Sequence, residues 1–124
     1  MTIAYWCVLA AGLMPFLWTI VAKTTGERFN NRHPREWQSR LTGMPSRAHA
    51  AHLNAFEAFP LFAAAVIVAD LHDAPQSTVD MLALAFIALR VLYGVLYLVD
   101  QHALRSLVWF AAIACAVWIF VLGA

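Results

Sequence analysis

Residues 1–22, MTIAYWCVLAAGLMPFLWTIVA, contain no charged side chain. Residues 107–124, LVWFAAIACAVWIFVLGA, contain none either, and residues 81–99, MLALAFIALRVLYGVLYLV, contain only Arg90. Each stretch approaches the roughly 20 apolar residues that a helix needs to cross the hydrocarbon core of a bilayer. Pro15 is expected to kink the first helix, which membrane helices tolerate when neighbours satisfy the freed carbonyl. These stretches predict three membrane-spanning helices.

The composition of the whole chain agrees with a lipid environment. Of its 124 residues, 63% are hydrophobic and 12% are charged, whereas a soluble domain is about half apolar and about a quarter charged. The first stretch lacks the basic start and the small-residue cleavage site of a signal peptide, so we expect it to be retained. We therefore predict a single all-α transmembrane domain over residues 1–124.

Polar residues set the expected ends of four spanning helices. These are residues 2–23, 46–71, 78–98 and 104–123. The second helix is the least obvious, because its first half carries Arg47, two histidines and Glu57 before the sequence turns apolar. Ser77 followed by Asp80 is typical of a capping box at the start of the third helix. Trp37, in the long polar first loop, is expected at the lipid headgroups.

Basic residues gather at one end of the predicted four-helix bundle. Six of them lie in or beside the first loop, namely Lys23, Arg28, Arg32, Arg35, Arg40 and Arg47. Arg105 lies beside the third loop, whereas Asp70, Asp73 and Asp80 are the formal charges around the second. The positive-inside rule then places loops one and three in the cytoplasm and both termini on the opposite side.

Two polar stripes at membrane depth indicate a candidate site. Their members are Arg47, Asn54 and Glu57 on the second helix and Arg90, Tyr93, Tyr97 and Asp100 on the third. Glu57 lies about 15 Å from the level of Arg47, and Arg90 lies about 15 Å from the level of Asp100, at about 1.5 Å per residue. An ionisable side chain at the bilayer centre costs roughly 2.5–3.5 kcal/mol and needs a partner or a purpose. We expect Glu57 and Arg90 to share a buried polar network, although such a pair can also serve only to fix helix register.

The polar positions all lie toward one side of the membrane, which favours a site open to the cytoplasm and the inner leaflet. Arg47, Arg90 and Arg105 could bind an anionic water-soluble ligand there, and a lipophilic molecule could enter from the bilayer. One-sided polar residues offer no path for a transporter. His49 and His52 form an i, i+3 pair without further ligands, so we expect no metal site. Nucleic-acid binding has no support.

Three motifs in this chain resemble those of the MAPEG family, the membrane-associated proteins in eicosanoid and glutathione metabolism. Residues 47–60, RAHAAHLNAFEAFP, resemble the family's helix-two signature, an Ala-His-x-Asn-x-x-Glu pattern followed closely by Pro. Residues 90–97, RVLYGVLY, are similar to its helix-three motif, and Arg105-Ser106 matches the pair that opens helix four. Helix number and loop order agree as well, so the resemblance covers nearly the whole chain.

The resemblance implies a homotrimer in membrane lipids, with glutathione bound between adjacent protomers near the cytoplasmic side. It assigns Arg105 and Ser106 to the catalytic position beside the glutathione thiol. The residues it assigns to holding glutathione or supporting its site are Arg47, His52, Asn54, Glu57, Arg90, Tyr93 and Tyr97. Glu57 would meet the amino group of the tripeptide. A cation beside the thiol favours the thiolate, which is the nucleophile.

The chain departs from the family pattern at three positions. Leu53 stands where many eicosanoid-active members have Arg, Ala55 stands where they often have Asp, and Tyr93 stands where some have His. The leading hypothesis is a glutathione-dependent membrane transferase or peroxidase that acts on lipophilic electrophiles or lipid hydroperoxides. The alternative, motivated by Leu53 and Ala55, is a non-catalytic scaffold or lipid-binding protein with the same fold.

Overall fold

The computed structural model describes residues 1–124 and contains five helices and no strands. Four of the helices are long and apolar enough to cross a membrane, which confirms an all-α bundle of four candidate spans. They are α1 (Ile3–Thr25), α3 (Gly43–Leu71), α4 (Gln76–Leu98) and α5 (His102–Leu122). Each expected helix end lies within three residues of the observed one. The fifth helix, α2 (Pro34–Ser39), is a short one in the first loop.

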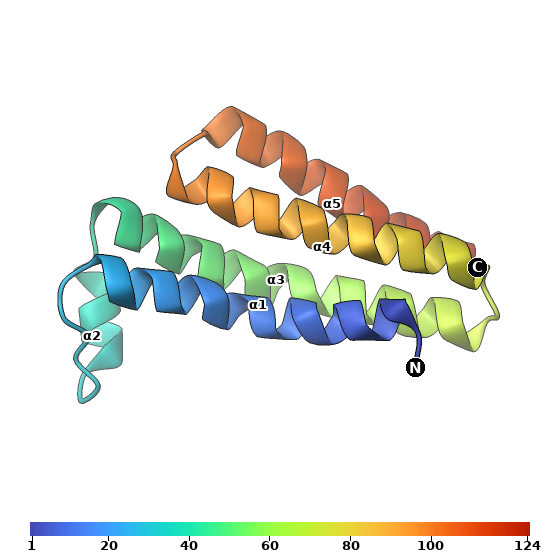
Figure 1. Ribbon diagram of the computed structural model, residues 1–124, viewed down its shortest axis with the longest axis horizontal. Helices are drawn as coiled ribbons and strands as arrows, with labels where there is room; N and C mark the ends of the chain where they lie inside the picture. The colour runs from blue at the N-terminus through green and yellow to red at the C-terminus, as the bar shows by residue number, and fades with distance from the viewer.

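The four long helices form two antiparallel pairs, α1 with α3 and α4 with α5 (Figure 1). Helices α3 and α4 are central, because each of them contacts all three of the other long helices. The two chain termini lie at one end of the bundle, and the loop that carries α2 and the α4–α5 turn lie at the other (Figure 1). Loops one and three therefore share an end, as the sequence predicts, while the assignment of that end to the cytoplasm stays a prediction.

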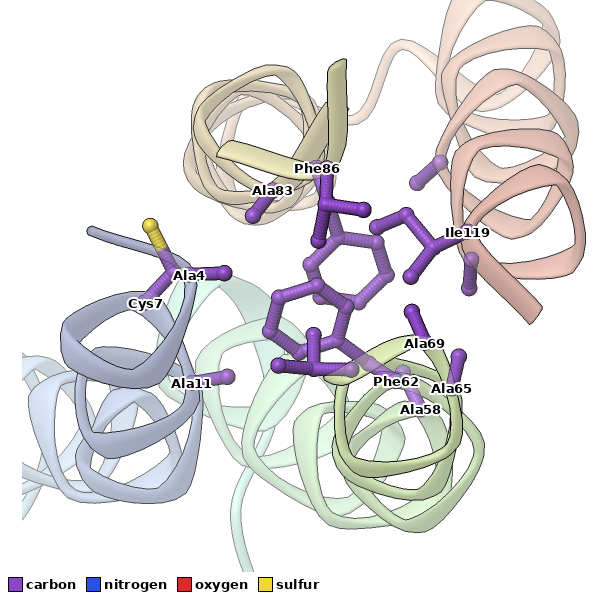
Figure 2. Close-up of a cluster of buried hydrophobic side chains, with 14 residues drawn as sticks. Ala4, Cys7, Ala11, Ala58, Phe62, Ala65, Ala69, Ala83, Phe86 and Ile119 are labelled. Carbon is purple, nitrogen blue, oxygen red and sulfur yellow. The ribbon is translucent and has the colours of Figure 1, made fainter. Parts of the chain in front are cut away.

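The core between the helices is built mainly from alanine. Figure 2 shows alanines of α1, α3 and α4 around two phenylalanine rings, with Ile119 of α5 closing the cluster. The rings of Phe62 and Phe86 stack with centroids 4.0 Å apart and planes 5° apart. Small residues let membrane helices approach closely, so that van der Waals packing and hydrogen bonds hold them together. The large apolar side chains point outward instead, as Leu107 and Phe110 do with 66% exposure each.

The predicted capping box at the start of α4 is wrong. The N-cap of α4 is Pro75, and no side chain caps this end. Asp80 instead reaches across to α1, where its Oδ1 accepts from the backbone N–H of Ala4 at 2.8 Å. The same oxygen accepts from the side chain of Gln76, one turn earlier on α4, at 2.7 Å. The first amides of a helix have no partner within the helix, and a carboxylate beside them is also favoured by the helix dipole.

The placement of Trp37 at the lipid headgroups is also wrong. Its side chain is only 2% exposed, and its Nε1 donates to the carbonyl of Glu27 at 3.2 Å. The ring packs edge-on against Phe29 and lies against Ala22 and Ala48 of the adjoining helices. The first loop is thus a folded segment with an aromatic core of its own.

Candidate functional site

Arg90 is the buried anchor of the polar residues. It lies on α4 with 2% of its surface exposed. Its Nη2 donates to Oδ1 of Asn54 at 2.8 Å, and Nδ2 of Asn54 donates to Oε2 of Glu57 at 3.2 Å. Asn54 and Glu57 are three residues apart on α3, a spacing that puts neighbouring side chains on one helix face. The expected connection between Glu57 and Arg90 is present, with Asn54 as the link between them, but the prediction that the whole network is buried is wrong, because Glu57 is exposed.

The two ends of this network differ in burial. Arg90 is enclosed within the protomer, whereas Glu57 is exposed on its surface. Glu57 lies about 15 Å along α3 from the level of Arg47, deep in the spanning segment. Its carboxylate therefore faces a region where no other helix of the same chain covers it.

Two tyrosines connect Arg90 to the start of α5. The guanidinium carbon of Arg90 lies 4.3 Å from the centre of the Tyr93 ring, and that of Arg105 lies 4.0 Å from the centre of the Tyr97 ring. The two rings meet edge to face, with centroids 5.7 Å apart. A cation is attracted to the face of an aromatic ring. This alternating stack holds both guanidinium groups in place on one side of the α4–α5 pair.

Arg105 and Ser106 line a cleft at the start of α5. Its other walls are Tyr93, Trp109 and Phe110, and its volume is about 210 Å³. Sites for small molecules usually measure about 300–1,000 Å³. One protomer thus supplies only part of the wall that a site for a small molecule needs. The sequence interpretation missed Trp109 and Phe110, although both lie three or four residues after Ser106 and so share its face.

Arg47 is not brought into this cleft. Its Nε donates to the backbone carbonyl of Leu98 at 3.1 Å, which is the last residue of α4. The carbonyl groups at a helix C-terminus are unpaired and carry partial negative charge, so a cation there is stabilising. Arg47 ties the start of α3 to the end of α4.

His52 also faces away from Asn54, toward α1. Its Nδ1 lies 2.6 Å from Oγ1 of Thr19 and 2.8 Å from the carbonyl oxygen of Pro15. Because a carbonyl can only accept, Nδ1 carries the proton and donates to it. The ring also stacks on His49, with centroids 5.6 Å apart. No group of three or more potential metal ligands occurs in the structure.

The two departures of α3 from the family pattern have different surroundings. Leu53 is 45% exposed on the outer surface of the protomer. Ala55 is 4% exposed and packs in a cluster with Met14 and Trp18 of α1. Leu53 therefore presents an apolar side chain at the surface, and Ala55 serves helix packing.

The fold and the site together define an integral multi-pass membrane protein. Within its spanning helices, hydrogen bonds link an arginine, an asparagine and a glutamate in series. The MAPEG family model matches residues 3–124, which is essentially the whole chain. The chain belongs to the MAPEG family, membrane proteins of glutathione and eicosanoid metabolism. Comparisons with curated proteins and with solved structures gave no match.

Proposed function

We propose that this protein is a glutathione-dependent membrane transferase or peroxidase that acts on lipophilic electrophiles or lipid hydroperoxides. The observation that carries the proposal is the cleft in which Arg105 and Ser106 lie beside Tyr93, next to the Arg90–Asn54–Glu57 chain. The guanidinium of Arg105 and the hydroxyl of Ser106 therefore lie at the edge of a hydrophobic bundle. Membership of the MAPEG family supports glutathione as the thiol.

The role of Arg105 follows from the chemistry of thiols. A nearby positive charge lowers a thiol pKa, and the thiolate is the reactive form. In substitution, the thiolate sulfur bonds to the electrophilic carbon while the bond to the leaving group breaks, and the leaving group takes the electron pair. In an addition to a double bond, the π electron pair moves to the far atom of that bond, which then takes a proton from solvent. In peroxide reduction, the sulfur attacks the terminal oxygen, the O–O bond breaks, and the alkoxide takes a proton to become an alcohol. A second glutathione then displaces water from the sulfenic acid and forms the disulfide.

Glu57 and Asn54 are the residues that we propose for holding the tripeptide. The exposed carboxylate of Glu57 suits the ammonium group of glutathione, and Asn54 offers amide groups beside it. Arg90 with Tyr93 and Tyr97 would keep these groups oriented. We assign Arg47 and His52 to supporting roles, because their polar atoms are bonded to the backbone of neighbouring helices.

We further propose that the protein assembles as a homotrimer and that glutathione lies between protomers. An ionised side chain at membrane depth costs roughly 2.5–3.5 kcal/mol when nothing covers it, and Glu57 is exposed in the single chain. A second copy packed over this face of α3 removes that cost. It also adds the wall that the small cleft lacks.

The lipophilic substrate has an apolar surface available on α5. A shallow groove of about 500 Å³ runs along this helix and is lined by Phe110, Ile113, Ala114, Val117, Trp118 and Val121. Phe110 belongs to both this groove and the cleft with Arg105. We propose that a lipophilic molecule enters from the bilayer along α5 and meets glutathione at Arg105. Glutathione would arrive from the cytoplasm, at the end where loops one and three lie.

The test is glutathione-dependent conjugation of a lipophilic electrophile and reduction of a lipid hydroperoxide by the purified protein. Arg105→Ala is expected to lose at least about tenfold in kcat/KM, because it removes the charge that favours the thiolate. Arg40→Ala is the matched control, since Arg40 is paired with Glu27 and Glu36 on the surface and should keep full activity. Wild-type protein without either activity contradicts the proposal.

A non-catalytic scaffold or lipid-binding role is the second candidate. Leu53 favours it, because an apolar side chain at an exposed position gives no charge to hold a carboxylate. Lipid retained by the purified trimer, in the absence of any glutathione binding, would support this role over catalysis. Competition between lipid and glutathione for the protein would favour the enzyme instead.

A further inference from the structure

One fully buried nitrogen of Arg90 has no hydrogen-bond partner. Its Nη2 donates to Asn54, but Nη1 is fully buried and bonds to nothing. Nearly all buried polar groups in proteins have a partner, either in the protein or in ordered water. A charged N–H group without a partner costs more than a neutral one. The side chain of Arg90 therefore requires an acceptor that the polypeptide does not provide.

Arg90 also lines a small cavity between the helices. The other lining residues are apolar and come from three helices, namely Ala11, Met14, Ala55, Ala58, Phe59 and Phe86. The space open to a molecule the size of water is about 10 Å³. A cavity needs about 10–15 Å³ measured in this way to hold one water molecule. The cavity thus has room for one water and for nothing larger.

A second polar group, in another residue of the same cavity wall, lacks its usual hydrogen-bond donor. Pro15 lies inside α1 and has no N–H, so it cannot donate to the carbonyl of Ala11, four residues before it. Membrane helices tolerate proline where a neighbouring group or a water re-satisfies the freed carbonyl. Ala11 lines the cavity together with Arg90. Nη1 of Arg90 is thus a donor without an acceptor, and the carbonyl of Ala11 is an acceptor without its usual donor.

We propose that one water molecule occupies this cavity, accepts a hydrogen bond from Nη1 of Arg90 and donates one to the carbonyl of Ala11. A buried water is stable when it has about two to four polar partners. The site binds water rather than an anion, because its volume excludes a carboxylate or a phosphate. Glu57 does not fill this role, since it joins the network from the exposed side through Asn54.

The inferred water would fix the orientation of the Arg90 side chain in the site. With Nη2 on Asn54, Nη1 on the water and the guanidinium over Tyr93, Arg90 is held from three sides. It is then a positioning residue, which fixes the amide of Asn54 without touching a ligand itself. The inference goes beyond the proposed function and holds whether or not the protein binds glutathione.

The test places a hydroxyl group where the water is inferred to lie. Ala11→Ser and Ala58→Ser present a hydroxyl to the cavity from two different helices, and each can replace the water as partner of Nη1. Ala65→Ser is the matched control, because Ala65 is fully buried in the apolar core and does not line the cavity. We expect the control to lower the melting temperature in detergent by about 5 °C, since it adds an atom to a packed apolar core where the hydroxyl has only the carbonyl of its own helix as a partner.

At least one of the two cavity variants is expected to melt within about 2 °C of the wild type. If both fall as far as Ala65→Ser, the inference is wrong. A high-resolution density map of the full chain gives the direct observation. A single peak within hydrogen-bonding distance of Nη1 supports the inference, and an empty cavity or a carboxylate of Glu57 on Nη1 overturns it.

Discussion

Replacing Asn54 with leucine should separate the two ends of the polar network while nearly keeping side-chain volume. The change removes the acceptor of Arg90 Nη2, which lies 2.8 Å from Asn54 Oδ1. Because Arg90 is only 2% exposed, bulk water cannot replace the lost acceptor. The second lost bond, to Glu57, involves an exposed partner and should contribute much less.

The expected loss of stability is about 2 kcal/mol, or roughly thirtyfold in the unfolding equilibrium. Hydrogen bonds between helices in a membrane average only about 0.6 kcal/mol and reach about 1.7 kcal/mol. Removing a partner from a buried charge in soluble proteins costs about 3–5 kcal/mol. Arg90 is charged but keeps its contact with Tyr93, so an intermediate value follows.

Equilibrium unfolding in mixed detergent micelles can measure this through a double-mutant cycle of Asn54→Leu and Arg90→Met. Replacing both partners by apolar residues removes the unsatisfied group, so the double variant should be more stable than the sum of the single losses. We expect a coupling energy of about 1.5–2 kcal/mol. A matched cycle of Asn30→Leu and Arg32→Met, in the exposed first loop, should give about zero.

Additivity of Asn54→Leu and Arg90→Met within about 0.5 kcal/mol would refute the reasoning. It would mean that the bond between α3 and α4 contributes nothing specific to the fold. Arg90 would then be buried for reasons of packing alone.

Three further predictions follow from the packing and the charge pattern. Gly94→Ala should lower stability by about 1–3 kcal/mol in a thermal assay, because a Cβ there would overlap the Trp18 ring. Gly12→Ala should cost less in the same assay, because its Cβ would lie 3.3 Å from the Phe59 ring. Asp80→Ala should cost about 1 kcal/mol and speed hydrogen exchange at the Ala4 amide, and unchanged exchange would contradict the cap. A tag on either terminus should be inaccessible from the cytoplasm, and a cytoplasmic tag would reverse the proposed topology.

Much of the fold is predictable from the sequence, because lipid imposes a simple rule. Long stretches with few or no charges favour spanning helices, and their polar ends place the boundaries within three residues of the observed ones. The network is predictable for a similar reason. Periodicity alone puts Asn54 and Glu57 on one face of α3, and Arg90 at matching depth has few other partners to choose from.

The parts that escaped prediction depend on contacts between distant segments. Asp80 follows the sequence pattern of a local cap, but it serves the start of α1, 76 residues away. Trp37 and the six-residue α2 depend on packing against Phe29 and the adjoining helices, because so short a helix has no stability of its own. The exposure of Glu57 could not be inferred either, since which face of a helix meets its own chain is decided by the whole bundle.

The most direct test of the central claim is a titration of the detergent-solubilised protein with glutathione, monitoring thiolate absorbance in the ultraviolet. The proposed site predicts a saturable rise in thiolate for the wild type and for Arg40→Ala, and none for Arg105→Ala. Absence of any thiolate signal in the wild type, or an equal signal in Arg105→Ala, would contradict a glutathione site built around Arg105.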